Sequence, residues 1–338
     1  MREAEFYKKQ EDKIICELCP HRCKLKDNEI GICGVRVRKG DKLHTLVYNR
    51  AASIAVDPIE KKPLFHFHPS KNILSIATLG CNMFCRFCQN YTLSFFEGKG
   101  KTEEIVGEEY SPDDLVLIAK KYDSMGIAYT YNEPTVFYEY LKDISVKIKE
   151  NGLKNVWVTN GYIEEEPQLA MEGLVDAVNN DLKFFSDKKY KKYTGASLKP
   201  VLETIKKWKK MGVWLEITTL IIPGVNDDEK EIDDIIGFIK DEIGVDTPWH
   251  ISKFHPSYKM SDYPPTPNET IKKIRERGLE QGLNFVYSGN LWGDEGENTY
   301  CPSCGKILIK RTGYKISEYN IRDGRCSFCG ENIKGEGL

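Results

Sequence analysis

The sequence predicts an α/β protein with a parallel sheet, and three observations carry this prediction. Short apolar runs rich in β-branched residues alternate with amphipathic helical stretches through most of the chain. Hydrophobic residues make up 40% and aromatic residues 11% of the 338 residues, which suffices for a sizeable core and excludes a largely disordered chain. The 11 cysteines fall into three tight groups, which predicts small metal-binding segments beside that core.

The apolar runs are the expected strands. They are Ile73–Thr78, Gly126–Tyr131, Asn155–Thr159, Val175–Asn179, Val213–Ile222 and Trp249–Phe254, with a seventh at Leu283–Tyr287. Alternation with helices requires crossover connections, so neighbouring strands are expected to lie parallel. Six or so such units form a barrel or an open part of one, and both forms bind ligands beyond the C-terminal ends of their strands.

Capping residues and apolar spacing mark the helices between these strands. Ser111 is expected to cap a helix that begins with Pro112. Apolar residues at helical spacing over Phe137–Ile148 predict the next helix, which Asn151-Gly152 closes. Further helices are expected near Ser186–Met211, Asp228–Glu242 and Asn268–Gln281.

The alternation divides the chain into three expected regions. Residues 1–70 form an N-terminal Cys-rich segment, with short strands at Leu43–Tyr48 and Ala52–Val56. Residues 71–289 form the α/β region, and residues 290–338 form a Cys-rich, zinc-ribbon-like tail.

Charge and hydropathy argue against several classes of partner and location for this protein. The chain has 49 Lys and Arg against 51 Asp and Glu, a net charge of −2, which argues against nucleic acid as the general partner. No run approaches the ~18 apolar residues of a membrane helix, and MREAEFYKKQ lacks the apolar stretch of a signal peptide. We therefore expect a cytoplasmic protein without a membrane partner.

The central cysteines predict a reactive metal site. The segment TLGCNMFCRFCQN follows directly on the first expected strand of the α/β region, so its thiolates are expected at that strand's C-terminal end. Cys81-x3-Cys85-x2-Cys88 places three thiolates close enough to share one cluster. A [4Fe–4S] cluster is usually held by four cysteines, so three leave one iron open. On spacing alone, a zinc site or a cluster completed by a distant cysteine is the structural alternative.

The segment CNMFCRFC resembles the CxxxCxΦC signature of radical S-adenosylmethionine (radical SAM) enzymes, with Phe87 as the Φ residue. The resemblance implies the family's partial (β/α)6 TIM-like radical SAM barrel and SAM bound to the open iron. It also implies the family's reaction, in which cluster reduction cleaves SAM to methionine and a 5′-deoxyadenosyl radical that abstracts hydrogen from a substrate. Cys81, Cys85 and Cys88 are then the catalytic cysteines, and the protein holds SAM in place and excludes water.

Two further motifs resemble the pyruvate formate-lyase-activating-enzyme branch of this superfamily. YNEPT supplies Asn132 and Glu133 where the family has its SAM-binding GGEP, with Tyr-Asn in place of Gly-Gly. VTNGY resembles DTNG and supplies Asn160, with Val158 in place of an Asp that helps to bind a monovalent cation. The resemblance implies that Asn132, Glu133 and Asn160 contribute to cofactor binding.

Two more motifs follow in the expected order. NDLKFF supplies Asp181 and Lys183 where the family has a D-x-K pair near the SAM carboxylate. KFHPSY supplies His255 where the activating enzyme has an important His after its sixth strand. A buried Asp–Lys pair and a lone His are also common structural features, and that alternative stays open. His66 and His68 alternate with aromatic residues in PLFHFHPS and are interpreted as structural.

The two outer cysteine groups predict further metal sites. Two C-x2-C pairs in the tail provide four thiolates, which favours structural zinc over rubredoxin-like iron: Cys301, Cys304, Cys326 and Cys329. Four thiolates near the N-terminus can bind zinc or an auxiliary Fe–S cluster, with zinc slightly favoured: Cys16, Cys19, Cys23 and Cys33.

The layout from about Cys16 to Gly330 resembles the radical SAM protein of the AmmeMemoRadiSam system. The resemblance implies Memo-type and AMMECR-type protein partners and an electron donor. Hydrogen abstraction from a glycyl-radical-type protein substrate is the first hypothesis for function. A radical reaction on a small molecule or an RNA is the second, and a non-catalytic Fe–S and zinc scaffold in the partner complex is the third.

Overall fold

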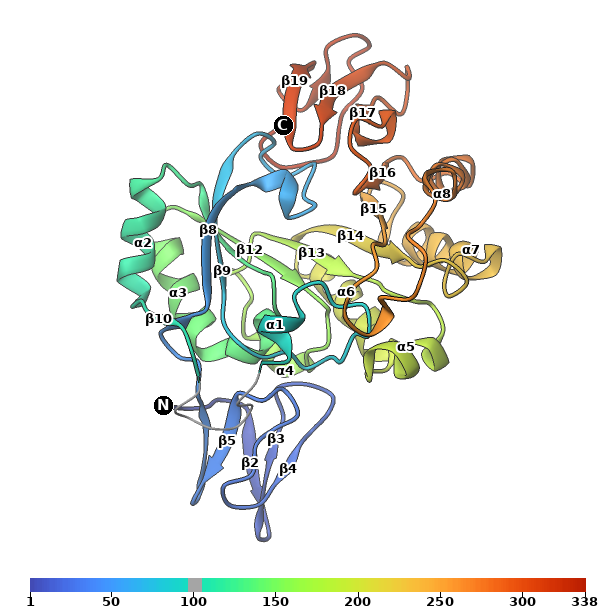
Figure 1. Cartoon of the computed structure of the whole chain (residues 1–338). Coiled ribbons are helices and arrows are strands. Elements are labelled where there is room, and N and C mark those ends of the chain that lie inside the picture. Colours follow the sequence, from blue (N-terminus) through green and yellow to red (C-terminus); the bar gives the residue numbers. More distant parts are fainter. Residues whose placement is uncertain (97–104) are drawn as a thin grey trace.

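The computed structural model describes residues 1–96 and 105–338, and its centre is one eight-stranded sheet (Figure 1). Seven strands run parallel, in the order β16-β15-β14-β13-β12-β11-β9. They are β9 (Asn72–Ala77), β11 (Gly126–Tyr129), β12 (Lys154–Thr159), β13 (Ala177–Asp181), β14 (Trp214–Ile221), β15 (Trp249–Lys253) and β16 (Val286–Gly289). The expected α/β fold with a mostly parallel sheet is confirmed.

An eighth strand, β8 (Ser53–Pro58), pairs antiparallel with β9 and forms one edge of the sheet. It comes from the segment before residue 71, so that segment contributes directly to the central sheet. Its first residues overlap the expected strand Ala52–Val56. A single strand-like run in the sequence, however, does not reveal which strand it pairs with or in which direction.

The crossover helices also lie where the sequence places them. They are α2 (Pro112–Lys121), α3 (Tyr138–Glu150), α5 (Asp187–Thr194), α6 (Leu198–Lys210), α7 (Glu229–Phe238) and α8 (Asn268–Glu280), with the shorter α1 (Tyr91–Ser94) and α4 (Glu165–Leu169). Ser111 caps α2 through a reciprocal capping box with Asp114. The single helix expected near Ser186–Met211 is wrong, because Gly195 ends α5 in the left-handed conformation with φ 72°.

Two small antiparallel modules flank the central sheet on opposite sides (Figure 1). The N-terminal module contains β1 (Arg2–Glu3), β2 (Tyr7–Gln10), β3 (Lys13–Cys16), β4 (Lys24–Leu25), β5 (Arg36–Lys39) and β6 (Lys42–Thr45). A short ribbon pairs β7 (Arg50–Ala51) with β10 (Glu108–Glu109). The C-terminal module contains β17 (Thr299–Tyr300), β18 (Ile307–Thr312), β19 (Lys315–Tyr319), β20 (Ile321–Arg322) and β21 (Arg325–Cys326).

Buried polar contacts attach each module to the central sheet or its helices. Arg36 of the N-terminal module pairs with Glu139 of α3 at 3.0 Å, and both side chains are buried. Arg311 of the C-terminal module donates to the Phe65 carbonyl oxygen at 2.9 Å. In the described part of the chain, no helix has both the length and the apolar character needed to cross a membrane.

Candidate functional site

A cavity opens at the C-terminal ends of the parallel strands. Its space, counted to include the opening to solvent, is about 1150 Å³. Nine of the predicted site residues line it: Cys81, Cys85, Phe87, Cys88, Asn132, Glu133, Asn160, Asp181 and Lys183. His255 is exposed and is not among the lining residues, so its role stays a prediction without support from the geometry. The topology brings the other nine together because the carboxyl ends of parallel strands meet at one edge.

The three central cysteines lie on the loop after β9. The backbone N–H of Met83 lies 3.4 Å from the Cys81 sulfur, and the Cys88 thiol lies 3.7 Å from the Ser94 hydroxyl. Burial raises the pKa of all three thiols, and that of Cys85 to about 12. The thiols are therefore protonated at neutral pH without a metal, and metal binding must release their protons.

Two amide side chains hold this cysteine loop. The Asn132 amide donates to the Gly80 carbonyl oxygen at 2.9 Å and to the Thr78 hydroxyl at 3.2 Å. The Asn160 amide donates to the Asn82 side-chain oxygen at 2.9 Å and lies 3.8 Å from the Cys81 sulfur. The loops after β11 and β12 thus set the position of the loop after β9.

Glu133 is a buried carboxylate whose hydrogen bonds join two loops. One oxygen accepts from the Thr135 hydroxyl at 2.6 Å and the Thr159 hydroxyl at 2.8 Å. The other accepts from the backbone N–H of Asn160 at 2.8 Å. Burial raises the pKa of Glu133. These contacts make Glu133 a positioning residue for Asn160.

Asp181 and Lys183 form an ion pair at the end of β13 that faces the cavity. Burial alone would lower the pKa of Lys183, but the neighbouring Asp181 carboxylate outweighs it and raises that pKa. Lys183 therefore stays cationic beside the cysteines. Its ammonium nitrogen also lies 5.9 Å from the centre of the Phe87 ring, which packs edge-on against Phe184.

Sequence reasoning missed a second group of cavity residues. Tyr131 has a positive φ of 67°, and its hydroxyl bonds to the buried carboxylate of Asp57. Burial would raise the pKa of Asp57, but hydrogen bonds from Lys61, Lys62 and Tyr131 hold it well below its usual range. Lys61 and Tyr131 line the cavity. The Lys-Lys pair in EKKPLF was the only signal, and it does not reveal its partners.

The C-terminal cysteines form a compact group. The Cys301 and Cys329 sulfurs are 3.6 Å apart, and the Cys304 and Cys326 sulfurs are 3.8 Å apart. All four sulfurs lie within 4.8 Å of one another. Four thiolates around a metal at ~2.3 Å would be roughly 3.8 Å apart, so this group can hold a single tetrahedral ion.

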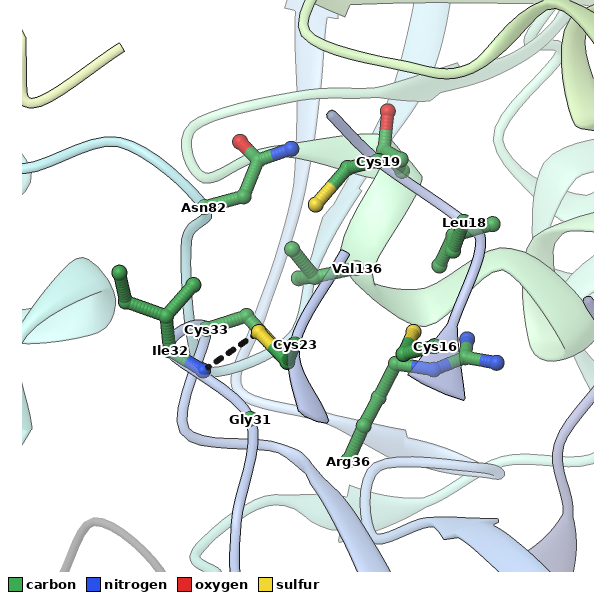
Figure 2. Close-up of a pocket in the computed structure, with 11 residues that line it drawn as sticks. Cys16, Leu18, Cys19, Cys23, Gly31, Ile32, Cys33, Arg36, Asn82 and Val136 are labelled. Atoms are coloured by element: carbon green, nitrogen blue, oxygen red, sulfur yellow. Dashed lines mark hydrogen bonds between the residues drawn. The ribbon is translucent and has the colours of Figure 1, made fainter. Parts of the chain in front are cut away.

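The N-terminal cysteines line a separate cavity of about 340 Å³, again counted with its opening (Figure 2). His66 and His68 lie outside both cavities. His66 contacts the Tyr287 hydroxyl at 2.5 Å and the Lys334 carbonyl oxygen at 2.7 Å, which agrees with a structural role.

Comparison with known proteins gives consistent similarities. The model of the Radical SAM superfamily matches residues 75–236. The uncharacterized protein MJ0808 of Methanocaldococcus jannaschii is 48% identical over 98% of this chain and 99% of its own length. A putative glycyl-radical enzyme activating enzyme of the same organism, MJ1227, is 30% identical over 52% of this chain and 71% of its own length. A radical SAM methyltransferase structure from Sphaerobacter thermophilus shares the fold at 13% identity, with a TM-score of 0.50 over 68% of this chain and 71% of that one.

Proposed function

Because this chain belongs to the radical SAM superfamily, we propose that it cleaves SAM reductively at a [4Fe–4S] cluster held by Cys81, Cys85 and Cys88. One observation carries the proposal. Three cysteines line the cavity at the strand ends, and among the described residues no fourth cysteine lines it. A cluster held there has one iron without a protein ligand, and SAM is the ligand that the superfamily uses at that iron.

The residues around the cavity fit such a cluster. Within the described chain, only the C-terminal group brings three or more ligating atoms within 4.8 Å of one another. The sulfurs of Cys81, Cys85 and Cys88 are therefore spaced more widely than the ligands of a single metal ion. The cavity, at about 1150 Å³, also leaves space beyond the cysteines. When bound, the cluster supplies the one-electron cleavage of SAM to methionine and a 5′-deoxyadenosyl radical that abstracts hydrogen.

The chain's own residues then hold the cysteine loop in place and bind SAM. Asn132 and Asn160 fix the cysteine loop, and Glu133 fixes Asn160. Asp181 and Lys183 present both signs of charge to the cavity, which suits the ammonium and carboxylate groups of the methionine part of SAM. We assign the sheet that holds these residues to the partial barrel of the superfamily.

A glycyl-radical-type protein is the proposed substrate, with an external electron donor. The relative MJ1227 carries the name of a putative glycyl-radical enzyme activating enzyme, which supports this choice. Polar side chains at Thr218, Ser252 and Asn290 also line the cavity and favour a small polar molecule as the second candidate. Memo-type and AMMECR-type partners and a structural zinc ion at the C-terminal cysteines belong to the same proposal.

The direct test is SAM cleavage by the anaerobically reconstituted protein. With dithionite and SAM, we expect multiple equivalents of 5′-deoxyadenosine per chain, measured by mass spectrometry. Protein prepared without reconstitution is the control and should give none. A protein with a full cluster and no deoxyadenosine, with or without the candidate partners, would contradict the proposal.

Replacing Asn160 by Ala tests the positioning of the cysteine loop. We expect the SAM-site cluster to be lost to a chelator about 10–100-fold faster, because residues that orient metal ligands contribute on this scale. Iron content is followed over time under anaerobic chelation. Asn155→Ala is the matched control, because Asn155 is a buried amide that bonds to Ser145 and Leu174 and lies outside the cavity. Equal iron loss in both variants would rule out a specific role for Asn160.

A further inference from the structure

The N-terminal cysteines surround a small, largely buried cavity. Cys16, Cys19 and Cys33 are at most 9% exposed, and Figure 2 shows the cysteine side chains arranged around the open space. Most of the remaining wall is apolar and consists of Leu18, Ile32, Val136 and Gly31.

Sulfur spacing within this chain separates two kinds of site. The C-terminal sulfurs pair at 3.6 and 3.8 Å, as expected around one zinc ion. In the part of the chain that the structure describes, no other group brings three or more ligating atoms within 4.8 Å. The N-terminal cysteines, like Cys81, Cys85 and Cys88, therefore leave no three sulfurs within 4.8 Å of one another, a wider spacing than that of the C-terminal group. A cubane requires such spacing, because its irons and sulfides stand between the thiolates.

The cavity wall also carries a buried cation with an unused donor. Arg36 is 2% exposed and lines the cavity together with the four cysteines. Its terminal nitrogens bond to Glu139 and to the Glu5 carbonyl oxygen, but its Nε has no partner among the described residues. A buried N–H of this kind costs free energy unless an acceptor is present. An anionic cluster ligated by four thiolates would supply that acceptor.

The cavity adjoins the loop that carries Cys81, Cys85 and Cys88. Asn82, the residue after Cys81, is part of its wall, and the His21 ring contacts the Asn82 carbonyl oxygen at 2.7 Å. A Cβ atom on Gly80, the residue before Cys81, would lie 2.7 Å from the Cys33 carbonyl oxygen. Segment 80–82, which includes Cys81, thus borders the N-terminal cavity.

We propose that Cys16, Cys19, Cys23 and Cys33 hold a second [4Fe–4S] cluster that passes electrons, one at a time, to the cluster at Cys81, Cys85 and Cys88. The relay rests on the proposed function, whereas the identity of the cluster does not. Four thiolates occupy all four irons, which leaves none for a substrate and makes electron transfer the role that fits.

The electron balance is simple. A low-potential one-electron donor, such as a flavodoxin hydroquinone, reduces the N-terminal cluster from the 2+ to the 1+ state. That electron then moves to the SAM-site cluster, which goes from 2+ to 1+, and the N-terminal cluster returns to 2+. No bond forms or breaks in the relay itself.

The identity of the cluster is tested without any SAM chemistry. A Cys81→Ala/Cys85→Ala/Cys88→Ala variant leaves the N-terminal group intact. After anaerobic reconstitution we expect about four iron, four sulfide and one zinc per chain, with an EPR signal on reduction. About two zinc and no iron per chain would overturn the proposal, and so would about two iron. This result is independent of whether the wild type cleaves SAM.

The relay is tested by the order of reduction in the wild type. On rapid mixing with flavodoxin hydroquinone, the EPR signal recorded in the triple variant should appear before the SAM-site signal. In a Cys19→Ser/Cys23→Ser variant, we expect deoxyadenosine formation to fall at least tenfold more with flavodoxin than with dithionite as reductant. Simultaneous reduction of both clusters, or equal effects with both reductants, would overturn the relay. Failure of the wild type to cleave SAM with dithionite would instead count against the proposed function.

Discussion

Replacing Cys85 by Ala is expected to abolish deoxyadenosine formation, by at least about 10³-fold, while the protein stays folded. Cys85 is 9% exposed and lines the cavity together with Phe87 and Lys183. Its removal leaves two thiolates where the proposed cluster needs three, and two cannot hold a [4Fe–4S] cluster in one orientation. Deoxyadenosine by mass spectrometry and iron per chain are the two measurements. Activity and SAM-site iron should disappear together.

The matched control for this variant lies in the third cysteine group. Cys304 is exposed and belongs to the compact C-terminal group. The C-terminal module lies on the side of the sheet opposite the N-terminal module (Figure 1). Cys304→Ala should lower the zinc content and leave the SAM-site iron in place. If Cys304→Ala removed SAM cleavage as completely as Cys85→Ala, the loss would report general unfolding and not a specific role of Cys85. A Cys85→Ala protein with wild-type deoxyadenosine yield would refute the assignment of the site.

The sequence predicted the strands of the sheet well because their signal is local. Each parallel strand is buried on both faces, so it appears as a continuous apolar run, as in the expected Val213–Ile222 and the observed β14. Once the strands are known to be parallel, their C-terminal ends must meet, and this placed Cys81 beside Asn160 and Asp181. Motifs that directly follow strands were therefore brought together as predicted.

Features that depend on tertiary partners could not be predicted in this way. The Asp57 carboxylate, the Lys62 ammonium and the Tyr131 hydroxyl meet only because β8 pairs with β9 beside β11. His255 follows β15 as expected, but its side chain is exposed, and no sequence pattern fixes the direction of a loop side chain. The cysteine spacing in the N-terminal sequence fits both zinc and iron, because the two metals differ in the distances between the folded sulfurs, which a sequence does not show.

At the N-terminal ends of the strands, one buried carboxylate holds several elements together. Glu216 of β14 is fully buried. It accepts from the backbone N–H groups of Phe65 and His66 at 2.9 and 2.8 Å and from the Trp214 indole at 3.0 Å. It also contacts the His250 ring at 2.6 Å. Because Phe65 in turn accepts from Arg311, this carboxylate links the central sheet to the C-terminal module.

Replacing Glu216 by Gln is therefore expected to cost about 3–5 kcal/mol, the usual range for breaking a buried ionic network. Glutamine has one acceptor oxygen in place of two and turns an N–H₂ group toward donors that are already buried. The melting temperature should fall by about 4–7 °C, measured by calorimetry on metal-loaded protein. Glu203→Gln is the control, because Glu203 is exposed on α6 and pairs with its neighbour Lys206 on the helix surface. It should change stability by at most about 0.5 kcal/mol.

The pH dependence distinguishes loss of this charge from a simple packing defect. Burial would raise the pKa of Glu216, but hydrogen bonds from His250 and Trp214 hold it below its usual value. A carboxylate with a lowered pKa stabilises the fold above its unfolded pKa of about 4.3 and loses that contribution as the pH falls. The difference in melting temperature between wild type and Glu216→Gln should therefore be largest near neutral pH and narrow below about pH 4. A difference that stays constant over that range would mean that Glu216 acts through its shape and not through its charge.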